Sequence, residues 1–214
     1  MRRTPDHPNL LAHDHPLIGH KLGILRDAST PPPTFRRVLG EIAGLMTYEA
    51  LRDLPTKACR VRTPIDDCDA TELAAPVTIV PILRAGLGMT DGMLRLVPEA
   101  RVGHIGVQRN EETHQPIEYY EKLPADIADG PVLVVDPMLA TGGSATYAVK
   151  YLKKRGCGTI RFLCLVAAPE GVQRMAEDHP EVEVHAAALD DRLNELAYIV
   201  PGLGDAGDRV FGTI

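Results

Sequence analysis

The sequence predicts an α/β fold in which helices flank a mostly parallel central sheet. From residue 76 onward, short apolar runs rich in β-branched residues alternate with segments of helical periodicity. Such alternation is typical of a parallel sheet covered by helices. A second observation is that each apolar run leads into a loop of charged or glycine-rich residues. The chain has 214 residues and no evident linker or repeat, so we expect one domain over residues 1–214.

The first predicted element is an amphipathic helix that follows the proline run 31–33. Thr34 can cap this helix, and apolar residues between 35 and 51 recur near helical spacing. Gly40 and Gly44 lie inside it and would let a second helix approach closely.

The alternating part of the chain contains five predicted strands. They are residues 77–83, 102–107, 132–135, 160–167 and 182–189, and the predicted helices among them are 87–97, 145–155 and 170–178. In open α/β sheets, ligands bind beyond the carboxyl ends of the strands. We therefore expect the loops after these strands to share one edge. They begin at Arg84, Gln108, Asp136, Pro169 and Asp190.

The loop after strand 132–135 is the most informative feature of the sequence. It consists of Asp136, Pro137, Met138, Leu139, Ala140, Thr141, Gly142, Gly143 and Ser144, and a helix follows. Glycines allow close backbone approach, and unpaired N–H groups and the dipole at a helix start favour an anion. Asp136 could accept hydrogen bonds from sugar hydroxyls. N–H groups that donate to a phosphate, next to a carboxylate that accepts from hydroxyls, predict a ribose 5-phosphate site.

The familiar phosphate motifs fit this loop poorly. No Lys follows the glycines, as it would in a Walker P-loop, and no G-x-G-x-x-G is present. The alternative interpretation is an ordinary strand-to-helix turn in which Thr141 or Ser144 merely caps the helix.

Composition argues against several classes of function. The net charge of -6 disfavours a general nucleic-acid binder, and no apolar run approaches the roughly 20 residues of a membrane helix. No C-x-x-C pair and no signal peptide are present, which favours the cytoplasm, and Cys164 is expected to be buried. His13, His15 and His20 lack the spacing of zinc sites, so we expect a flexible or partner-contacting terminus there.

A long charged segment follows Arg109. Residues 110–122 exceed the length of a normal connection, which indicates a lid or a functional hairpin with Arg109 at its base. The alternative is a solvated surface insertion.

The last segment is unusually rich in special backbone positions. Residues 198–209 hold three glycines, one proline and two aspartates. Repeated glycine suggests backbone N–H and C=O groups arranged around a flat polar ligand.

Together these motifs resemble the uracil phosphoribosyltransferase family. The resemblance covers nearly the whole chain and rests on residues 15–23, 81–89, 136–144 and 202–208. It implies a type I phosphoribosyltransferase-like fold with a lid or hairpin arm and a C-terminal base-binding segment. It also implies transfer of the 5-phosphoribosyl group from 5-phosphoribosyl 1-diphosphate (PRPP) to N1 of uracil. The products are UMP and diphosphate, the reaction belongs to pyrimidine salvage, and Mg²⁺ is bound with PRPP.

The resemblance assigns roles to individual residues. PRPP would be bound by Arg84, Arg109, Asp136, Pro137, Met138, Leu139, Ala140, Thr141, Gly142, Gly143, Ser144 and Asp205. Uracil would be bound by Ile199, Gly204, Asp205 and Ala206. Asp136 and Arg109 would be catalytic, and no residue is assigned to a metal.

Two positions depart from the wider pattern of phosphoribosyltransferases. Pro137 follows Asp136, where many of these enzymes have a second acidic residue; this resembles the uracil-specific family. Gln108 precedes Arg109, where many relatives have a tyrosine, so no stacking or hydroxyl role carries over to that position.

The resemblance also implies a homo-oligomer, either dimer or tetramer, and GTP activation in some relatives. The residues themselves give neither the oligomeric state nor a GTP site. Two alternatives stay open at this point. An RNA-binding regulator on the same fold is disfavoured by the acidic balance and the lack of a basic stripe, and a phosphoribosyltransferase for another base remains because the Asp136 loop does not name the base.

Overall fold

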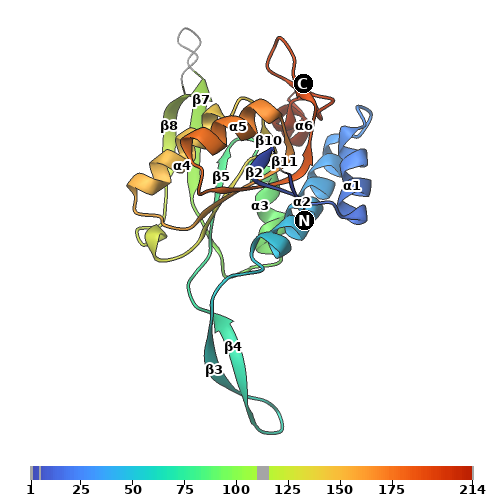
Figure 1. Cartoon of the computed structure of the whole chain (residues 1–214). Coiled ribbons are helices and arrows are strands. Elements are labelled where there is room, and N and C mark those ends of the chain that lie inside the picture. Colours follow the sequence, from blue (N-terminus) through green and yellow to red (C-terminus); the bar gives the residue numbers. More distant parts are fainter. Residues whose placement is uncertain (1, 5, 110–115, 214) are drawn as a thin grey trace.

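The structure, a computed structural model, describes residues 2–4, 6–109 and 116–213, with backbone alone for 2–4, 109, 116 and 118. Figure 1 shows a central sheet with helices on both of its faces and a hairpin that projects away from the body. Among the described residues, no helix is long and apolar enough to cross a membrane.

The central sheet confirms the predicted parallel core. Its strand order is β1-β2-β12-β11-β9-β5-β7-β8, with β10 beside β11 and β6 beside β5. The strands are β1 (Arg2–Thr4), β2 (His7–Ala12), β5 (Thr78–Leu83), β6 (Arg101–Val102), β7 (His104–Arg109), β8 (Pro116–Lys122), β9 (Val132–Val135), β10 (Met138–Leu139), β11 (Ile160–Ala167) and β12 (Glu183–Leu189). The pairs from β2 through β12, β11, β9 and β5 to β7 are parallel, whereas β1 and β8 pair antiparallel.

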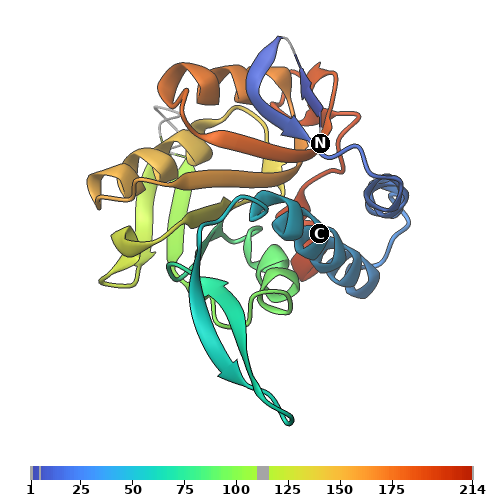
Figure 2. The same ribbon diagram turned by 60° about the horizontal axis from the view of Figure 1, so that its bottom comes forward.

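The helices form a layer on each face of the sheet. They are α1 (Pro16–Arg26), α2 (Pro32–Ala50), α3 (Leu87–Leu94), α4 (Gly143–Lys154), α5 (Pro169–Asp178) and α6 (Ala206–Phe211), with a 3-10 turn at Ile127–Asp129. Strand β9 contributes to the core on both faces of the sheet, because its alternate side chains point to opposite faces. Leu133 and Val135 join the core under α1, α2, α3 and α6, whereas Val132 and Val134 join the core under α4 and α5. Figure 2 shows these two layers from another direction.

The glycines of α2 permit the predicted close helix contact. A Cβ added to Gly92 of α3 would lie 1.8 Å from the carbonyl oxygen of Gly40, and one added to Gly44 would lie 3.0 Å from the carbonyl oxygen of Gly92. The two backbones therefore touch at this crossing, and no larger residue fits at Gly92.

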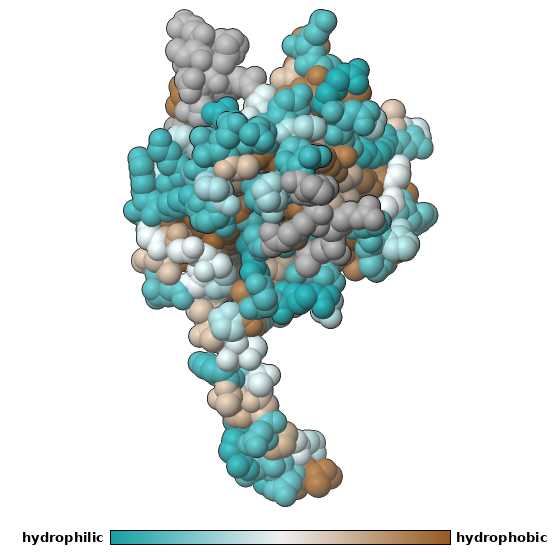
Figure 3. Space-filling model, viewed as in Figure 1, coloured by the Kyte–Doolittle hydropathy of each residue, from teal (hydrophilic) through white to brown (hydrophobic). Residues whose placement is uncertain are grey.

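The projecting hairpin is an element that the sequence did not predict. It consists of β3 (Thr56–Arg62) and β4 (Asp67–Leu73), and most of its side chains on both faces are exposed. Ion pairs cross the ladder, for example Lys57 to Glu72 at 3.1 Å and Arg62 to Asp67 at 3.1 Å. Figure 3 shows mixed hydropathy along it. With no buried face, the hairpin has no apolar alternation that would reveal it in the sequence.

Of the two alternatives predicted for the early histidines, a flexible segment is wrong for His13 and His15, and a partner-contacting one stays a prediction. Strand β2 pairs with β12, and His13, only 3% exposed, lies with its Nε2 3.1 Å from Nδ1 of His185. Burial lowers the pKa of His13 to about 4. His15 accepts a hydrogen bond from the Leu17 N–H at 3.1 Å and so caps α1.

Other boundaries moved only slightly. The predicted strand 102–107 is divided at Gly103 into β6 and β7, and the predicted helix 87–97 ends at Leu94. Cys164 is fully buried, as predicted.

Candidate active site

Asp136 lies where β9 ends. Its backbone N–H donates to the Leu163 carbonyl at 3.2 Å, and its Oδ1 accepts a hydrogen bond from the Met138 N–H at 3.3 Å. The residue keeps partial solvent exposure, but protein surrounds its carboxyl group. This burial, together with the nearby charge of Asp205, raises the pKa of Asp136 to about 7. Two carboxylates predicted for the site are thus close enough to act on each other.

The loop after Asp136 is anchored to the sheet. Strand β10 pairs with β11, and the Pro137 carbonyl accepts hydrogen bonds from the N–H groups of Leu165 at 2.9 Å and Val166 at 3.1 Å. Leu139 is 1% exposed, so its side chain belongs to the core and only its backbone can face a ligand.

The loop ends at the start of α4. The N-cap residue is Gly142, with a φ of 76°, and the Thr146 N–H donates to the Gly142 carbonyl at 2.9 Å. The cap position therefore belongs to neither Thr141 nor Ser144, which disfavours the interpretation of this loop as a side-chain-capped turn. The first-turn N–H groups have no partner within the helix, and the dipole favours an anion beside them.

Helix α5 supports this loop from behind. A Cβ added to Gly171 would lie 2.4 Å from the Ala140 carbonyl oxygen and 2.7 Å from that of Leu139. This contact fixes the loop backbone without any side chain in between. A rigid backbone at this place suits recognition of a phosphate.

Arg84 follows β5 at the same edge of the sheet. Its side chain is exposed, with Nη2 3.8 Å from Asp208 Oδ1 and the guanidinium 5.8 Å from the ring centre of Phe211. A Cβ on Gly86 would lie 2.4 Å from the Val135 carbonyl oxygen, so this loop touches the end of β9. Arg84 is thereby placed between the Asp136 strand and α6.

Arg109 is the last residue of β7, and its backbone pairs with Pro116 of β8. The carboxyl end of β7 lies beside that of β5, as predicted. The Arg109 side chain and residues 110–115 lie outside the described residues, and so does the predicted tip of the lid. Gln108 is exposed next to it.

The C-terminal segment reaches the same edge. Strands β13 (Arg192–Leu193) and β14 (Ile199–Val200) form a small antiparallel pair, and α6 follows. Asp205 caps α6 by accepting a hydrogen bond from the Asp208 N–H at 2.9 Å. Ile199 and Ala206 are buried, so only their backbone groups could contact a ligand, whereas Gly204 is exposed with a φ of 75°.

Sequence reasoning missed the residues that hold this segment. Arg26 pairs with Asp190, and both bind Gly202, while Arg209 donates to the Leu203 carbonyl at 2.8 Å. The residues of the Arg26–Asp190 pair are far apart along the chain, so no local sequence pattern predicts the contact. The only signal was the polar residue Asp190 at the end of a strand.

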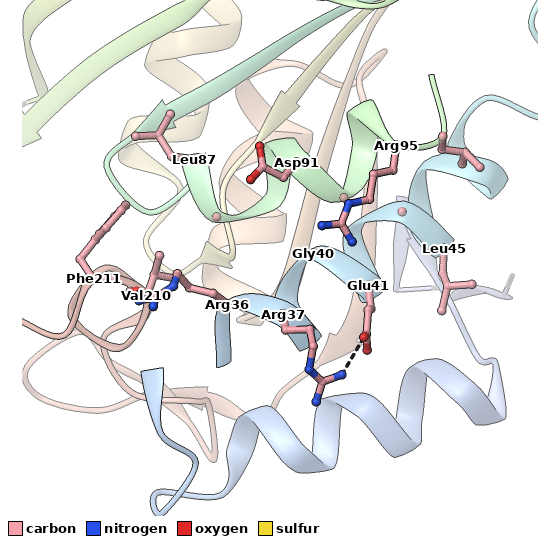
Figure 4. Close-up of a pocket in the computed structure, with 14 residues that line it drawn as sticks. Arg36, Arg37, Gly40, Glu41, Leu45, Leu87, Asp91, Arg95, Val210 and Phe211 are labelled. Atoms are coloured by element: carbon pink, nitrogen blue, oxygen red, sulfur yellow. Dashed lines mark hydrogen bonds and ion pairs between the residues drawn. The ribbon is translucent and has the colours of Figure 1, made fainter. Parts of the chain in front are cut away.

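A groove of about 590 Å³ lies beside this edge, between α2, α3 and α6. Figure 4 shows Arg36, Arg37, Asp91 and Arg95 along it, with the ion pair from Arg37 to Glu41. None of the predicted site residues lines this groove. The chemistry expected at Asp136 therefore belongs to the strand edge and not to this groove.

Among the residues that the structure describes, no group of three or more His, Cys, Asp or Glu residues could hold a metal ion.

Comparison with known proteins decides the family. The sequence profile of uracil phosphoribosyltransferase matches residues 12–213. The chain belongs to the uracil phosphoribosyltransferase family. The matched range includes the Asp136 loop, Arg84 and the C-terminal segment, and it agrees with the resemblance found in the sequence.

Individual relatives agree with this family assignment. The uracil phosphoribosyltransferases of Levilactobacillus brevis and of Streptococcus pneumoniae serotype 4 are 59% and 61% identical to this chain, and each alignment covers 94% of it and 96% of the relative. The solved structure of the AQ2163 protein from Aquifex aeolicus has a TM-score of 0.90 at 40% identity, over 94% of this chain and 97% of that one.

A more distant structure supports the fold alone. A hypoxanthine-guanine phosphoribosyltransferase from Bacillus anthracis has a TM-score of 0.50 at 10% identity, covering 74% of this chain and 80% of that chain. The family fold is thus the type I phosphoribosyltransferase arrangement predicted from the sequence.

Proposed function

We propose that this enzyme transfers the 5-phosphoribosyl group from PRPP to N1 of uracil and releases UMP and diphosphate. The observation that carries the proposal is that Asp136, at the head of the glycine-rich loop, lies near enough to Asp205 of the C-terminal segment for the Asp205 charge to act on it. A loop suited to ribose 5-phosphate thus lies beside a backbone-rich segment suited to a flat base. The whole chain, residues 1–214, would form one domain around this site.

The proposed reaction uses each part of the site for one task. The backbone of residues 137–144 binds the 5-phosphate, because the unpaired N–H groups at the start of α4 favour an anion. Asp136 accepts hydrogen bonds from the ribose hydroxyls. As the bond to diphosphate breaks, positive charge develops on the ribose, and the ionised carboxylate of Asp136 offsets it.

Arg84 and Arg109 bind the leaving diphosphate in this proposal. Their strands end side by side, and the Arg84 side chain is exposed at that edge. Uracil is held by backbone groups of Ile199, Gly204 and Ala206 together with Asp205. Fixing both reactants in one place supplies much of the rate.

Mg²⁺ would arrive with PRPP and would neutralise charge on the diphosphate. Mg²⁺ commonly binds through one or two carboxylates together with substrate phosphates and water. The carboxylates of Asp136 and Asp205 provide oxygen donors of this kind.

Three further properties are proposed from the resemblance. The enzyme works in the cytoplasm, it assembles into a dimer or tetramer, and GTP activates it as an allosteric effector. The exposed β3–β4 hairpin, with Ile65 88% exposed at its tip, is consistent with an assembly. Sedimentation of the purified protein tests the oligomeric state, and turnover measured with and without GTP tests the activation.

The experiment for the main proposal is a turnover assay with PRPP, Mg²⁺ and a panel of nucleobases. We expect UMP from uracil, no comparable product from purine bases, and loss of the product when Mg²⁺ is chelated. A folded preparation that binds PRPP but forms no UMP, either with or without GTP, would contradict the proposal.

A further inference from the structure

The backbone of Gly202 is held by two residues from distant parts of the chain. Its N–H donates to Asp190 Oδ2 at 2.9 Å, and its carbonyl accepts a hydrogen bond from Arg26 Nη1 at 2.7 Å. Arg26 also binds Asp190 through both of its terminal nitrogens, at 2.9 Å and 2.5 Å. The three residues therefore form a closed ring of contacts, which we call the Arg26–Asp190 clamp.

The clamp is attached to rigid parts of the fold. The Asp190 side chain is only 4% exposed, and its backbone N–H donates to the Ala167 carbonyl of β11 at 2.8 Å. Arg26 is the last residue of α1. A buried carboxylate needs such compensation, and a two-point contact with Arg fixes its orientation as well as its charge.

Gly202 can be held here only because of its backbone conformation. Its φ is 62°, and a Cβ would lie 2.1 Å from the Ile199 carbonyl oxygen. The clamp thus fixes a tight turn at Gly202. This turn comes directly before Gly204 and Asp205, which are predicted to contact uracil. Any movement of this turn would shift those backbone groups.

A second contact holds the next residue to the same helix end. Arg209 donates to the Leu203 carbonyl at 2.8 Å and to the Asp27 carbonyl at 2.6 Å, and it stacks on Phe35 at 4.4 Å. The end of α1 therefore holds Gly202 directly through Arg26, and Arg209 bridges it to Leu203.

We propose that Arg26 and Asp190 are positioning residues for the nucleobase. They act through Gly202 and keep the backbone groups of residues 199–206 in the geometry that binds uracil. This inference rests on the proposed function. The phosphate loop has supports of its own in its pairing with β11 and its contact with α5, and within residues 199–206 only Asp205 is also assigned to PRPP. The clamp should therefore affect the binding of uracil much more than the binding of PRPP.

The test compares steady-state kinetics of Asp190→Asn, Arg26→Met and Arg26→Lys with the wild type. We expect the KM for uracil to rise roughly 10- to 100-fold in the first two variants, because small displacements of binding groups have effects of that size. The KM for PRPP should change by less than about threefold. Arg26→Lys should be intermediate, since Lys keeps the charge but lacks the two-pronged geometry of Arg.

A second readout does not depend on turnover. Hydrogen exchange of a peptide covering residues 199–206 should be faster in the variants, while a peptide from β11 keeps its wild-type exchange. Asp53→Asn is the matched control, because Asp53 also pairs with an arginine, Arg161, at 2.8 Å but at the amino end of β11. It should change neither KM and should not affect exchange in 199–206.

Two results would overturn the clamp. One is an unchanged uracil KM with unchanged exchange in 199–206; the other is an equal rise in both KM values. If wild-type enzyme forms no UMP, the proposed function fails, and the exchange comparison alone then supports or refutes the clamp. If Asp190→Asn does not fold, the Arg26→Lys variant provides the same readouts.

Discussion

The carboxylate of Asp205 lies close enough to Asp136 for its negative charge to raise the pKa of the Asp136 carboxyl, in addition to the larger effect of burial. The result is a pKa of about 7, against 3.8 for an unperturbed aspartate. Asp136 therefore carries a proton in part of the free protein at neutral pH. Both the stability and the activity of the protein should depend on this proton.

Stability should fall as the pH rises from about 4 to about 7 through this one group. In that range the folded state keeps the proton of Asp136, whereas the unfolded state has released it. The free energy of unfolding therefore falls as the pH rises. Asp136→Asn removes this titration. Relative to wild type, the variant should gain stability with rising pH, by up to about 4 kcal/mol at pH 8. Urea unfolding of both proteins at pH 5 and pH 8 measures the change, and an equal difference at the two values would refute it.

Turnover should suffer in the same Asp136→Asn variant. The variant lacks the negative charge that is proposed to offset the cationic ribose. The transition state should therefore lose about 2–4 kcal/mol of stabilisation, and kcat/KM for PRPP should fall roughly 30- to 1000-fold. Asp129→Asn, an exposed change on the 3-10 turn, is the control and should retain wild-type activity. Wild-type kcat/KM in Asp136→Asn would mean that Asp136 only shapes the loop.

The crossing of α2 and α3 should tolerate no side chain at Gly92. Gly92→Ala places a Cβ 1.8 Å from the Gly40 carbonyl oxygen, so the helices must separate, and we expect a loss of about 1–3 kcal/mol. Gly19→Ala is the matched control, because a Cβ at this position in α1 meets nothing within 4 Å. That change should be neutral or stabilise by up to about 1 kcal/mol. Thermal or urea unfolding compares the two, and an equal effect would contradict the close contact.

Uracil should be strongly preferred over cytosine. Uracil offers O4 as an acceptor and N3–H as a donor, and cytosine reverses both. Backbone groups in residues 199–206 cannot rotate to suit the reversed pattern as a side-chain amide could. A site built on hydrogen bonds can discriminate by about 10⁴. The measurement is kcat/KM for each base at saturating PRPP, and values within about tenfold of each other would show that this segment does not select the base.

The parallel core could be predicted because its signals are local. Strands such as β9 and β11 are buried on both faces, so they appear as continuous apolar runs, and β11 has the predicted bounds. The loop at Asp136 could be predicted for a related reason. Its glycines and its place between a strand and a helix are visible within a short stretch of sequence.

The remaining parts depend on partners that the local sequence does not show. The β3–β4 hairpin buries no face, so no hydrophobic period marks it. His13 seemed to belong to a polar tail, yet His185 and strand β12 enclose it. The raised pKa of Asp136 and the contacts of Gly202 likewise arise from residues that meet only in the folded chain.

The pairing of β2 with β12 has a consequence for the order of folding. Leu10, Leu11 and Ala12 lie opposite Val184, His185 and Ala186, so this edge joins segments separated by most of the chain. Bringing these two segments together closes a loop of most of the chain, and this costs conformational entropy before stabilising contacts form. Such non-local parallel pairs therefore form slowly. We expect β2 to dock last, onto a sheet already assembled from β12 to β7, and to be the first strand released as denaturant is added.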